Sequence, residues 1–290
     1  MLGQLNIFGK TKLETTLDRI RQFEPEEGYF VAFSGGKDSQ CIYHLCKMAG
    51  VKFDAHYRVT SVDPPELVRF IKENYPDVSR EVPKDKDWNS ITMWKLIPKA
   101  KIQPTRLARY CCAELKESGG DGRVTMTGVR WAESVNRKKN QGGVTVFGKA
   151  KSTRRILDEN NIEYHETDRG GVVLNFDDDT SRRGAELCYR TRRTLVNPII
   201  DWTDDEVWEF LNDVVQVPHC SLYDEGRKRI GCIGCPMAGK KGMERDFARY
   251  PKYKDAYIRA FDRMLKEYDT PPKKWKTAEE VFQWWIGEDE

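Results

Sequence analysis

Apolar residues along the chain fall into two patterns, short continuous runs and residues at helical spacing. A continuous apolar run predicts a strand at 29–33. Further strands are predicted at 53–59 and at 123–129, where Val124, Met126 and Val129 are the apolar positions. Helical spacing predicts helices at 11–23, 66–75 and 88–99, and a further helix that starts near Lys37. Strands that alternate with helices predict an α/β protein with a parallel, doubly wound sheet.

The second half of the chain divides less regularly. Residues 137–183 read as an insertion with a short strand near 172–176, and Thr203 and Glu206 have the spacing of a capping box that opens a helix. Aromatic residues at helical spacing predict helices at 250–268 and after Thr277. We therefore expect an N-terminal helix at 1–27, a main domain at 28–240 and a helical C-terminal extension at 241–290.

Composition narrows the class of protein without naming it. The chain has 290 residues, 33% of them charged, and a net charge of +3, which does not by itself imply a nucleic-acid partner. No apolar run approaches the roughly 18 residues of a membrane span, and the N-terminus lacks the layout of a signal peptide. We expect a cytoplasmic protein with no membrane association. The many aromatic residues of the last helices are expected to pack a core or a homodimer interface.

The stretch YFVAFSGGKDS at 29–39 joins the first strand to the next helix through a glycine turn. Glycines let the backbone approach an anion closely, and the first N–H groups of a helix have no partner within it. Lys37 adds a cation. The other loop residues predicted to bind the anion are Ser34, Gly35, Gly36, Asp38 and Ser39. The spacing fits neither a Walker loop nor a dinucleotide loop.

This stretch resembles the SGGxDS loop of the PP-loop ATP pyrophosphatases, which include adenylyl-sulfate and phosphoadenylyl-sulfate (PAPS) reductases and tRNA-thiolating enzymes. The resemblance implies an adenine nucleotide alpha hydrolase-like fold of the HUP type. It also implies that the loop holds the phosphates of ATP, with Mg2+, or those of an adenylyl sulfonucleotide. Lys37, Asp38 and Arg130 are the expected catalytic residues.

A second motif follows the third strand, where the chain reads GVRWAES and then Arg137. It resembles the GxRxxES motif of the same family, in which this segment helps to bind nucleotide and substrate. The expected ligands are Gly128 and Arg130 for the nucleotide and, for the substrate, Glu133, Ser134 and Arg137. Thr60 and Asp63 end the second strand, where they could reach a nucleotide or cap the helix that begins near Pro65.

The cysteines indicate a metal site. Adjacent Cys111 and Cys112 are poorly suited to a single tetrahedral zinc ion, whose ligands are usually spaced by two to four residues, whereas a [4Fe–4S] cluster takes one thiolate per iron. The pattern CC…CxxC, completed by Cys232 and Cys235, resembles that of iron–sulfur adenylyl-sulfate reductases. Zinc and no metal stay as alternatives. Cys220 is close enough in sequence to replace one member of the first pair, and Cys41 and Cys46 are expected to pack in the core.

Residues 137–155 contain seven basic and no acidic side chains together with three glycines. They predict either a solvated loop or a flexible basic arm that contacts a nucleic acid. Asp177, Asp178 and Asp179 are expected to form an exposed acidic turn rather than a divalent-cation site.

We expect an enzyme that adenylates a nucleic acid or a small molecule with release of pyrophosphate. Sulfur would then come from a cluster-bound sulfide or from a partner persulfide, supplied by a cysteine desulfurase or a thioredoxin-like protein. One alternative is a sulfonucleotide reductase, although the ECGxH-like tail of that branch is missing after Cys235. Another is a binding module that senses nucleotide or redox state.

Overall fold

The first strands and helices alternate as the apolar pattern predicts. The computed structural model describes residues 2–6, 8–147, 150–168, 170–174, 178–188, 193–268 and 274–287. Up to the third helix, the elements are α1 (Lys12–Gln22), β1 (Tyr29–Ala32), α2 (Lys37–Ala49), β2 (Phe53–Arg58), α3 (Pro65–Asn74) and β3 (Ser79–Glu81). Thr11 and Glu14 form the predicted capping box before α1. The expected helix at 88–99 is shorter, because α4 covers Met93–Ala100.

The middle of the chain is more regular than its sequence suggests. Its elements are α5 (Tyr110–Leu115), β4 (Val124–Met126), the 3-10 turn η1 (Trp131–Glu133), α6 (Val135–Asn140), β5 (Val144–Phe147), α7 (Ala150–Glu159), β6 (Tyr164–Glu166), β7 (Val172–Leu174) and α8 (Asp179–Cys188). The basic segment is therefore neither an irregular loop nor a flexible arm where it is described. Four of its basic side chains form ion pairs with acidic residues nearby, namely Arg137, Lys139, Arg154 and Arg155.

The expected acidic turn is also a helix start. Asp179 opens α8, and the carboxylate of Asp178 accepts a hydrogen bond from the backbone N–H of Ser181. Carboxylates are favourable there because they satisfy unpaired N–H groups and oppose the helix dipole. Asp177 lies outside the described residues.

The last part of the chain is mostly helical. It contains β8 (Arg193–Val196), α9 (Asp204–Glu209), the π-turn η2 (Phe210–Val214), the 3-10 turn η3 (Pro236–Ala238), α10 (Gly239–Arg249), α11 (Pro251–Lys266) and α12 (Ala278–Ile286). None of the described helices is both long and apolar enough to cross a membrane.

The strands form one sheet in the order β3-β2-β1-β4-β8-β5-β7-β6. The pairs β2–β1, β1–β4 and β4–β8 are parallel, while β5 pairs antiparallel with both β8 and β7. The predicted α/β fold is thus confirmed, and the insertion extends it by an antiparallel edge. The chain leaves β1 toward β2 on one side and later returns to β4 on the other, so the order of strands reverses between β1 and β4.

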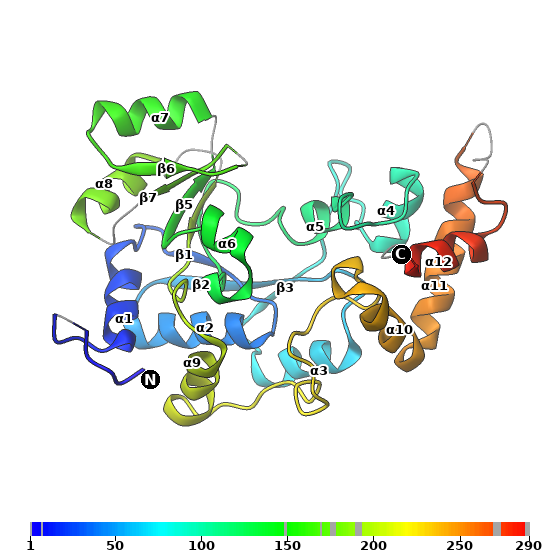
Figure 1. The fold of residues 1–290 in the computed structure, drawn as a ribbon, viewed down its shortest axis with the longest axis horizontal. Helices are drawn as coiled ribbons and strands as arrows, with labels where there is room; N and C mark the ends of the chain where they lie inside the picture. The colour runs from blue at the N-terminus through cyan, green and yellow to red at the C-terminus, as the bar shows by residue number, and fades with distance from the viewer. Residues whose placement is uncertain are drawn as a thin grey trace. The chain divides into compact units, whose positions relative to one another are not determined.

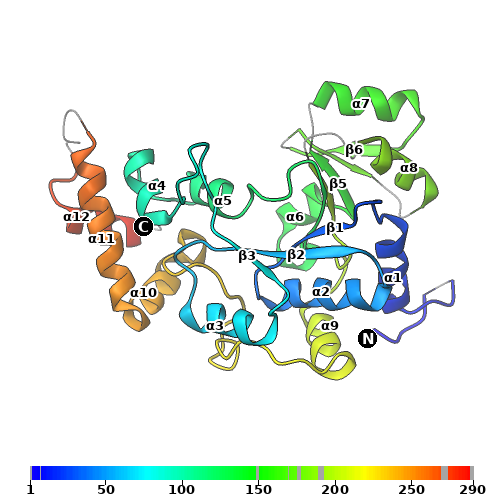
Figure 2. The same cartoon turned by 180° about the vertical axis from the view of Figure 1, so that it is seen from behind.

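The chain divides into two compact units, which we describe separately. The first comprises residues 1–57, 70–79 and 120–220, and the second comprises 58–69, 80–119 and 221–290. In the first unit, α1 and α9 both pack against α2, and α8 packs on β5 and β7. Figure 1 and the reverse view in Figure 2 show α1 beside α2. The predicted boundary at residue 241 does not coincide with a boundary of either unit.

The second unit has its own hydrophobic core. Helix α11 packs against α4, α10 and α12, and their buried side chains include Tyr257, Phe261, Phe282 and Trp285. The aromatic residues of the C-terminal helices therefore form a core, which is one of the two roles expected for them. The indole N–H of Trp285 donates to the carbonyl oxygen of Pro104 at 2.6 Å, which satisfies the polar atom of this buried ring.

Candidate functional site

The glycine turn after β1 forms the start of α2. Gly35 has φ +73°, in the left-handed region that favours glycine. Ser34 is exposed; its hydroxyl donates to that of Ser39 at 3.2 Å, and the hydroxyl of Ser39 donates to the carbonyl of Gly36 at 2.8 Å. The loop thus presents hydroxyl groups beside the N-terminal N–H groups of a 13-residue helix, an arrangement suited to an anion.

The loop after β4 lies against this turn. A Cβ atom at Gly128 would come within 2.8 Å of the Cβ of Asp38, so glycine permits the close approach of the two segments. Both loops leave the carboxyl ends of neighbouring parallel strands where the strand order reverses. Open α/β sheets bind ligands at such a point.

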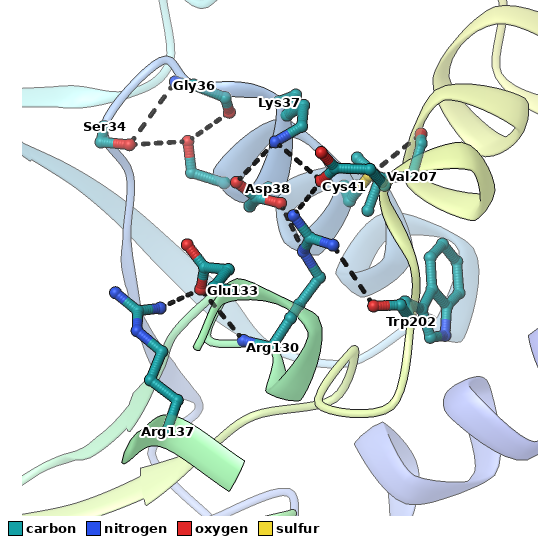
Figure 3. Close-up of polar contacts among 12 residues, drawn as sticks. Ser34, Gly36, Lys37, Asp38, Cys41, Arg130, Glu133, Arg137, Trp202 and Val207 are labelled. Atoms are coloured by element: carbon teal, nitrogen blue, oxygen red, sulfur yellow. Dashed lines mark hydrogen bonds and ion pairs between the residues drawn. The ribbon is translucent and has the colours of Figure 1, made fainter. Parts of the chain in front are cut away.

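Arg130 and Lys37 form the charged centre of this region (Figure 3). The side chain of each is 2% exposed. The Nε of Arg130 donates to Asp38 at 2.7 Å, its Nη1 to the carbonyl of Trp202 at 3.3 Å and its Nη2 to Asp204. The ammonium of Lys37 lies 3.4 Å from a carboxylate oxygen of Asp38 and 3.3 Å from Asp204.

Two carboxylates therefore balance two buried cations. Burial opposes the charge of Arg130, but Asp38 and Asp204 outweigh it and raise the pKa of the guanidinium. Burial by itself would raise the pKa of the Asp204 carboxyl. The hydrogen bond from Arg130 and the charge of Lys37 outweigh burial and lower this pKa. Sequence reasoning missed Asp204, although the capping box at Thr203 and Glu206 marked the helix start that carries it.

The predicted substrate residues lie on the short elements after Arg130. The carboxylate of Glu133 accepts from the backbone N–H of Arg130 at 3.2 Å and pairs with the guanidinium of Arg137. Ser134 caps α6 by accepting from the N–H of Arg137 at 3.2 Å. Their roles in binding substrate stay predictions.

The four predicted metal-binding cysteines lie together in the second unit. Cys111 and Cys112 are on α5, Cys232 and Cys235 on the loop before η3, and all four line one pocket. All eight cysteines are described and none forms a disulfide. The other four are buried: Cys41 and Cys46 pack in the core as expected, and Cys188 and Cys220 do not line the pocket.

Cationic and hydroxyl groups surround the thiols. A nitrogen of Arg109 lies 3.6 Å from the sulfur of Cys112, and the pKa of Cys112 is lowered by a hydrogen bond from Cys111 and by Arg109. The charge of Cys232, followed by that of Asp63, raises the pKa of Lys116, a pocket residue that sequence reasoning missed. The thiolate is thus favoured at Cys112, whereas burial raises the pKa of Cys235 and favours its thiol.

Thr60 belongs to the cysteine pocket, in the second unit. Its hydroxyl oxygen lies 3.7 Å from the sulfur of Cys232, and its backbone N–H donates to Asp63 at 2.9 Å. Asp63 thus holds the turn that precedes α3. The role of Thr60 in nucleotide binding stays a prediction.

The helical part of the second unit holds the Cys232–Cys235 loop in place. The N–H of Gly234 donates to the buried carboxylate of Asp246 at 3.2 Å, which also pairs with Arg227 at 2.7 Å. The hydroxyl of Tyr257 donates to the carbonyl of Ile233 at 3.0 Å, and the N–H of Ile233 donates to the carbonyl of Val62 at 2.8 Å. The two cysteines thus project from a loop whose backbone is fixed on both sides.

Comparison with known proteins places these features in context. Residues 28–238 match the model of the phosphoadenosine phosphosulfate reductase domain. The chain is 37% identical over 249 residues to an uncharacterized protein of Methanocaldococcus jannaschii, covering 82% of this chain and 48% of that protein. It is 44% identical over 46 residues to the adenosine 5'-phosphosulfate reductase of Oceanobacillus iheyensis, covering 16% of this chain and 19% of that protein. A second uncharacterized protein of M. jannaschii is 24% identical over 249 residues, with 82% of this chain and 41% of that protein covered. The chain thus spans about half the length of the two M. jannaschii proteins.

Proposed function

Because the chain belongs to the phosphoadenosine phosphosulfate reductase family, we propose that it binds an adenine nucleotide at the loop after β1 and uses ATP to adenylate a substrate. The observation that carries the proposal is the meeting of this loop with the loop after β4, where the strand order reverses. Ser34, Ser39 and the N–H groups at the start of α2 would bind the phosphates, with Mg2+ balancing their charge. Lys37 and Arg130 are the nearby cations that would offset charge on the leaving pyrophosphate.

The cysteines outside the pocket favour adenylation over reduction of a sulfonucleotide. Reduction by the chain itself needs an accessible thiol that attacks sulfur. The four cysteines away from the pocket are buried, and we assign the other four to metal binding. A reductase that borrows a thiol from a partner remains the second candidate.

Nucleotide use is tested by incubating the protein with ATP and with each adenylyl sulfonucleotide plus thioredoxin. We expect pyrophosphate release from ATP and no sulfite. Ser34→Ala should weaken ATP binding because Ser34 is an exposed hydroxyl of the loop, while Ser221→Ala, an exposed serine of the other unit, should not. Abundant sulfite would instead establish the reductase, and tight ATP binding without turnover would favour a sensing module.

We further propose that Cys111, Cys112, Cys232 and Cys235 hold a [4Fe–4S] cluster. The support for this proposal is that the four thiols line one pocket, since a cluster takes one thiolate at each of four separate irons. The described residues contain no group of three or more His, Cys, Asp or Glu side chains already placed to hold a metal ion. Arg109 and Lys116 would offset the negative charge of the thiolates. When bound, the cluster would supply redox-active iron for sulfur transfer.

The iron and sulfide content of anaerobically purified protein tests this assignment. We expect about four irons per chain in the native protein and a broad visible absorption band. Cys232→Ser should lose most of the iron, while Cys220→Ser should retain it because Cys220 does not line the pocket. Iron retained by Cys232→Ser and lost by Cys220→Ser would contradict the ligand set.

The basic face of α6 is the proposed contact for a nucleic-acid substrate. Lys138 and Lys139 are exposed on α6, one turn after Glu133 and Ser134. If they contact phosphates, affinity for nucleic acid should fall steeply with salt, and Lys138→Ala with Lys139→Ala should reduce that slope. The control is Lys86→Ala with Lys252→Ala, which removes the same charge from the other unit. A flat salt response would favour a small-molecule acceptor, with the sulfur donor a separate protein in either case.

A further inference from the structure

Asp204 shares one oxygen atom between the two buried cations of the candidate nucleotide site. Its Oδ1 accepts a hydrogen bond from Nη2 of Arg130 and lies 3.3 Å from the ammonium of Lys37. We propose that Asp204 is a tethered anion that occupies the position of a ligand phosphate and yields these contacts when a phosphate-bearing ligand binds. The inference rests on the proposed nucleotide function and assigns a specificity-determining residue to that site.

Burial separates the members of this network into two layers. The side chains of Lys37 and Arg130 are each 2% exposed, whereas that of Asp204 is 58% exposed. The cations therefore lie beneath an outward-facing carboxylate. An exposed carboxylate can return to water at little cost, while a buried cation that loses its partner is strongly disfavoured. Asp204 is thus the member that an incoming anion can replace.

The other carboxylate is held differently. Asp38 follows Lys37 on α2, its side chain is 23% exposed, and one of its oxygens accepts from Nε of Arg130 at 2.7 Å. The same residue also lies against Gly128. Asp38 is therefore part of the packing between the two loops, and its partner Arg130 keeps one counter-ion after Asp204 leaves.

The local sequence explains how Asp204 reaches this position. Thr203 caps α9 by accepting from the N–H of Glu206 at 3.2 Å, and the carboxylate of Glu206 accepts from the N–H of Thr203 at 2.8 Å. The box fixes Asp204 in the first turn of α9, and α9 packs against α2. Asp205, the next residue, is also exposed. Unlike Asp204, it forms no ion pair with Arg130 or Lys37, which makes it a matched control.

The charge balance gives the expected consequence. With Asp204 in place, two positive and two negative groups cancel, so an anion gains little net attraction. Without its charge, one of the two carboxylates that pair with these cations is neutral, and the site attracts one further negative group. The native site therefore discriminates against weakly charged ligands and admits those whose phosphate can replace a carboxylate.

The test compares binding of ATP, inorganic pyrophosphate and adenosine by calorimetry. We expect Asp204→Asn to bind ATP and pyrophosphate about tenfold more tightly than the native protein and to leave adenosine binding unchanged. Asp204→Glu should restore native affinity, and Asp205→Asn should behave as the native protein. Asp204→Ala provides a second neutral variant if Asp204→Asn folds poorly, as judged by its thermal melting.

Equal or weaker binding of both phosphate ligands by the folded neutral variants would overturn the inference and leave the proposed nucleotide function intact. Conversely, a native protein that binds no adenine nucleotide would refute the proposed function, while the pyrophosphate comparison would still test Asp204. An equal gain in affinity with Asp205→Asn would show that the effect comes from general surface charge. That result would also overturn the inference.

Discussion

At the scale of single residues, the candidate site depends on groups with more than one partner. Arg130 uses Nε, Nη1 and Nη2 to contact Asp38, Trp202 and Asp204, respectively. A guanidinium can make these divergent contacts because its donors lie in a rigid plane, whereas an ammonium is a compact charge. Position 130 therefore requires the geometry of an arginine side chain as well as its charge.

Replacing Arg130 by lysine should lower the free energy of unfolding by about 2 kcal/mol, because buried acceptors lose their donors. Denaturant unfolding measures the change. The control is Arg137→Lys, since the side chain of Arg137 is 34% exposed and pairs with Glu133 within one helical turn; its loss should stay below about 0.5 kcal/mol. Similar losses in both variants would contradict the role assigned to Arg130.

His44 introduces a dependence of stability on pH. Burial, followed by the charge of Lys47, lowers its pKa from 6.5 to about 4. As the pH falls from 6.5 toward 4, the unfolded chain therefore binds a proton at His44 that the native state does not bind. The contribution of neutral His44 to stability is complete above pH 6.5 and is lost as the pH falls toward 4. The native protein should become easier to unfold over that window.

His44→Gln should reduce this loss, which urea unfolding at several pH values would measure. The control is His165→Gln, because His165 is exposed. If protonation of Asp and Glu alone caused the pH dependence, the native protein and both variants would show the same profile. An unchanged profile for His44→Gln would therefore contradict the role assigned to His44.

At the scale of elements, the loop Cys232–Cys235 shows how helices prepare a binding site. Gly234 has φ +69°, and a Cβ atom there would come within 2.4 Å of the ring of Phe247 on α10. Asp246 on the same helix accepts the N–H of Gly234. The helix thus imposes a loop conformation that glycine alone adopts easily.

Gly234→Ala should both strain this backbone and displace Phe247, and so reduce the iron retained after anaerobic reconstitution to less than about half of the native content. Gly231→Ala is the matched control, because nothing lies within 4 Å of a Cβ atom there and its φ is not in the left-handed region. Full iron content in Gly234→Ala would show that the loop adapts to its metal.

At the scale of the whole molecule, each of the two compact units contains one part of the proposed function. The phosphate loop, Arg130 and Asp204 lie in the first unit, and the four pocket cysteines lie in the second. The second unit depends on the C-terminal helices for its core, since Tyr257 lines the cysteine pocket and also packs against Trp285.

Trp285→Ala should therefore lower the free energy of unfolding of the second unit by about 3–5 kcal/mol through loss of a buried aromatic ring. Trp88→Ala removes an equal side chain that is 79% exposed and should cost less than about 0.5 kcal/mol. Thermal melting of both variants measures the difference. Comparable melting temperatures would show that the C-terminal helices do not support this core.

The sequence by itself determined the local elements and the family. Apolar spacing, the capping residues Thr11 and Thr203, and the glycines of the phosphate loop act over a few neighbouring residues, so their signals are readable along the chain. Family resemblance identified the four cysteines, and the tertiary structure placed them in one pocket. Only the tertiary structure revealed Asp204 as a partner of Arg130, 74 residues away in sequence, and placed Thr60 among the thiols. The basic insertion became helices and a strand because it pairs with β8 and its charges find acidic partners. Such contacts join residues that are distant in sequence, and no local pattern records them.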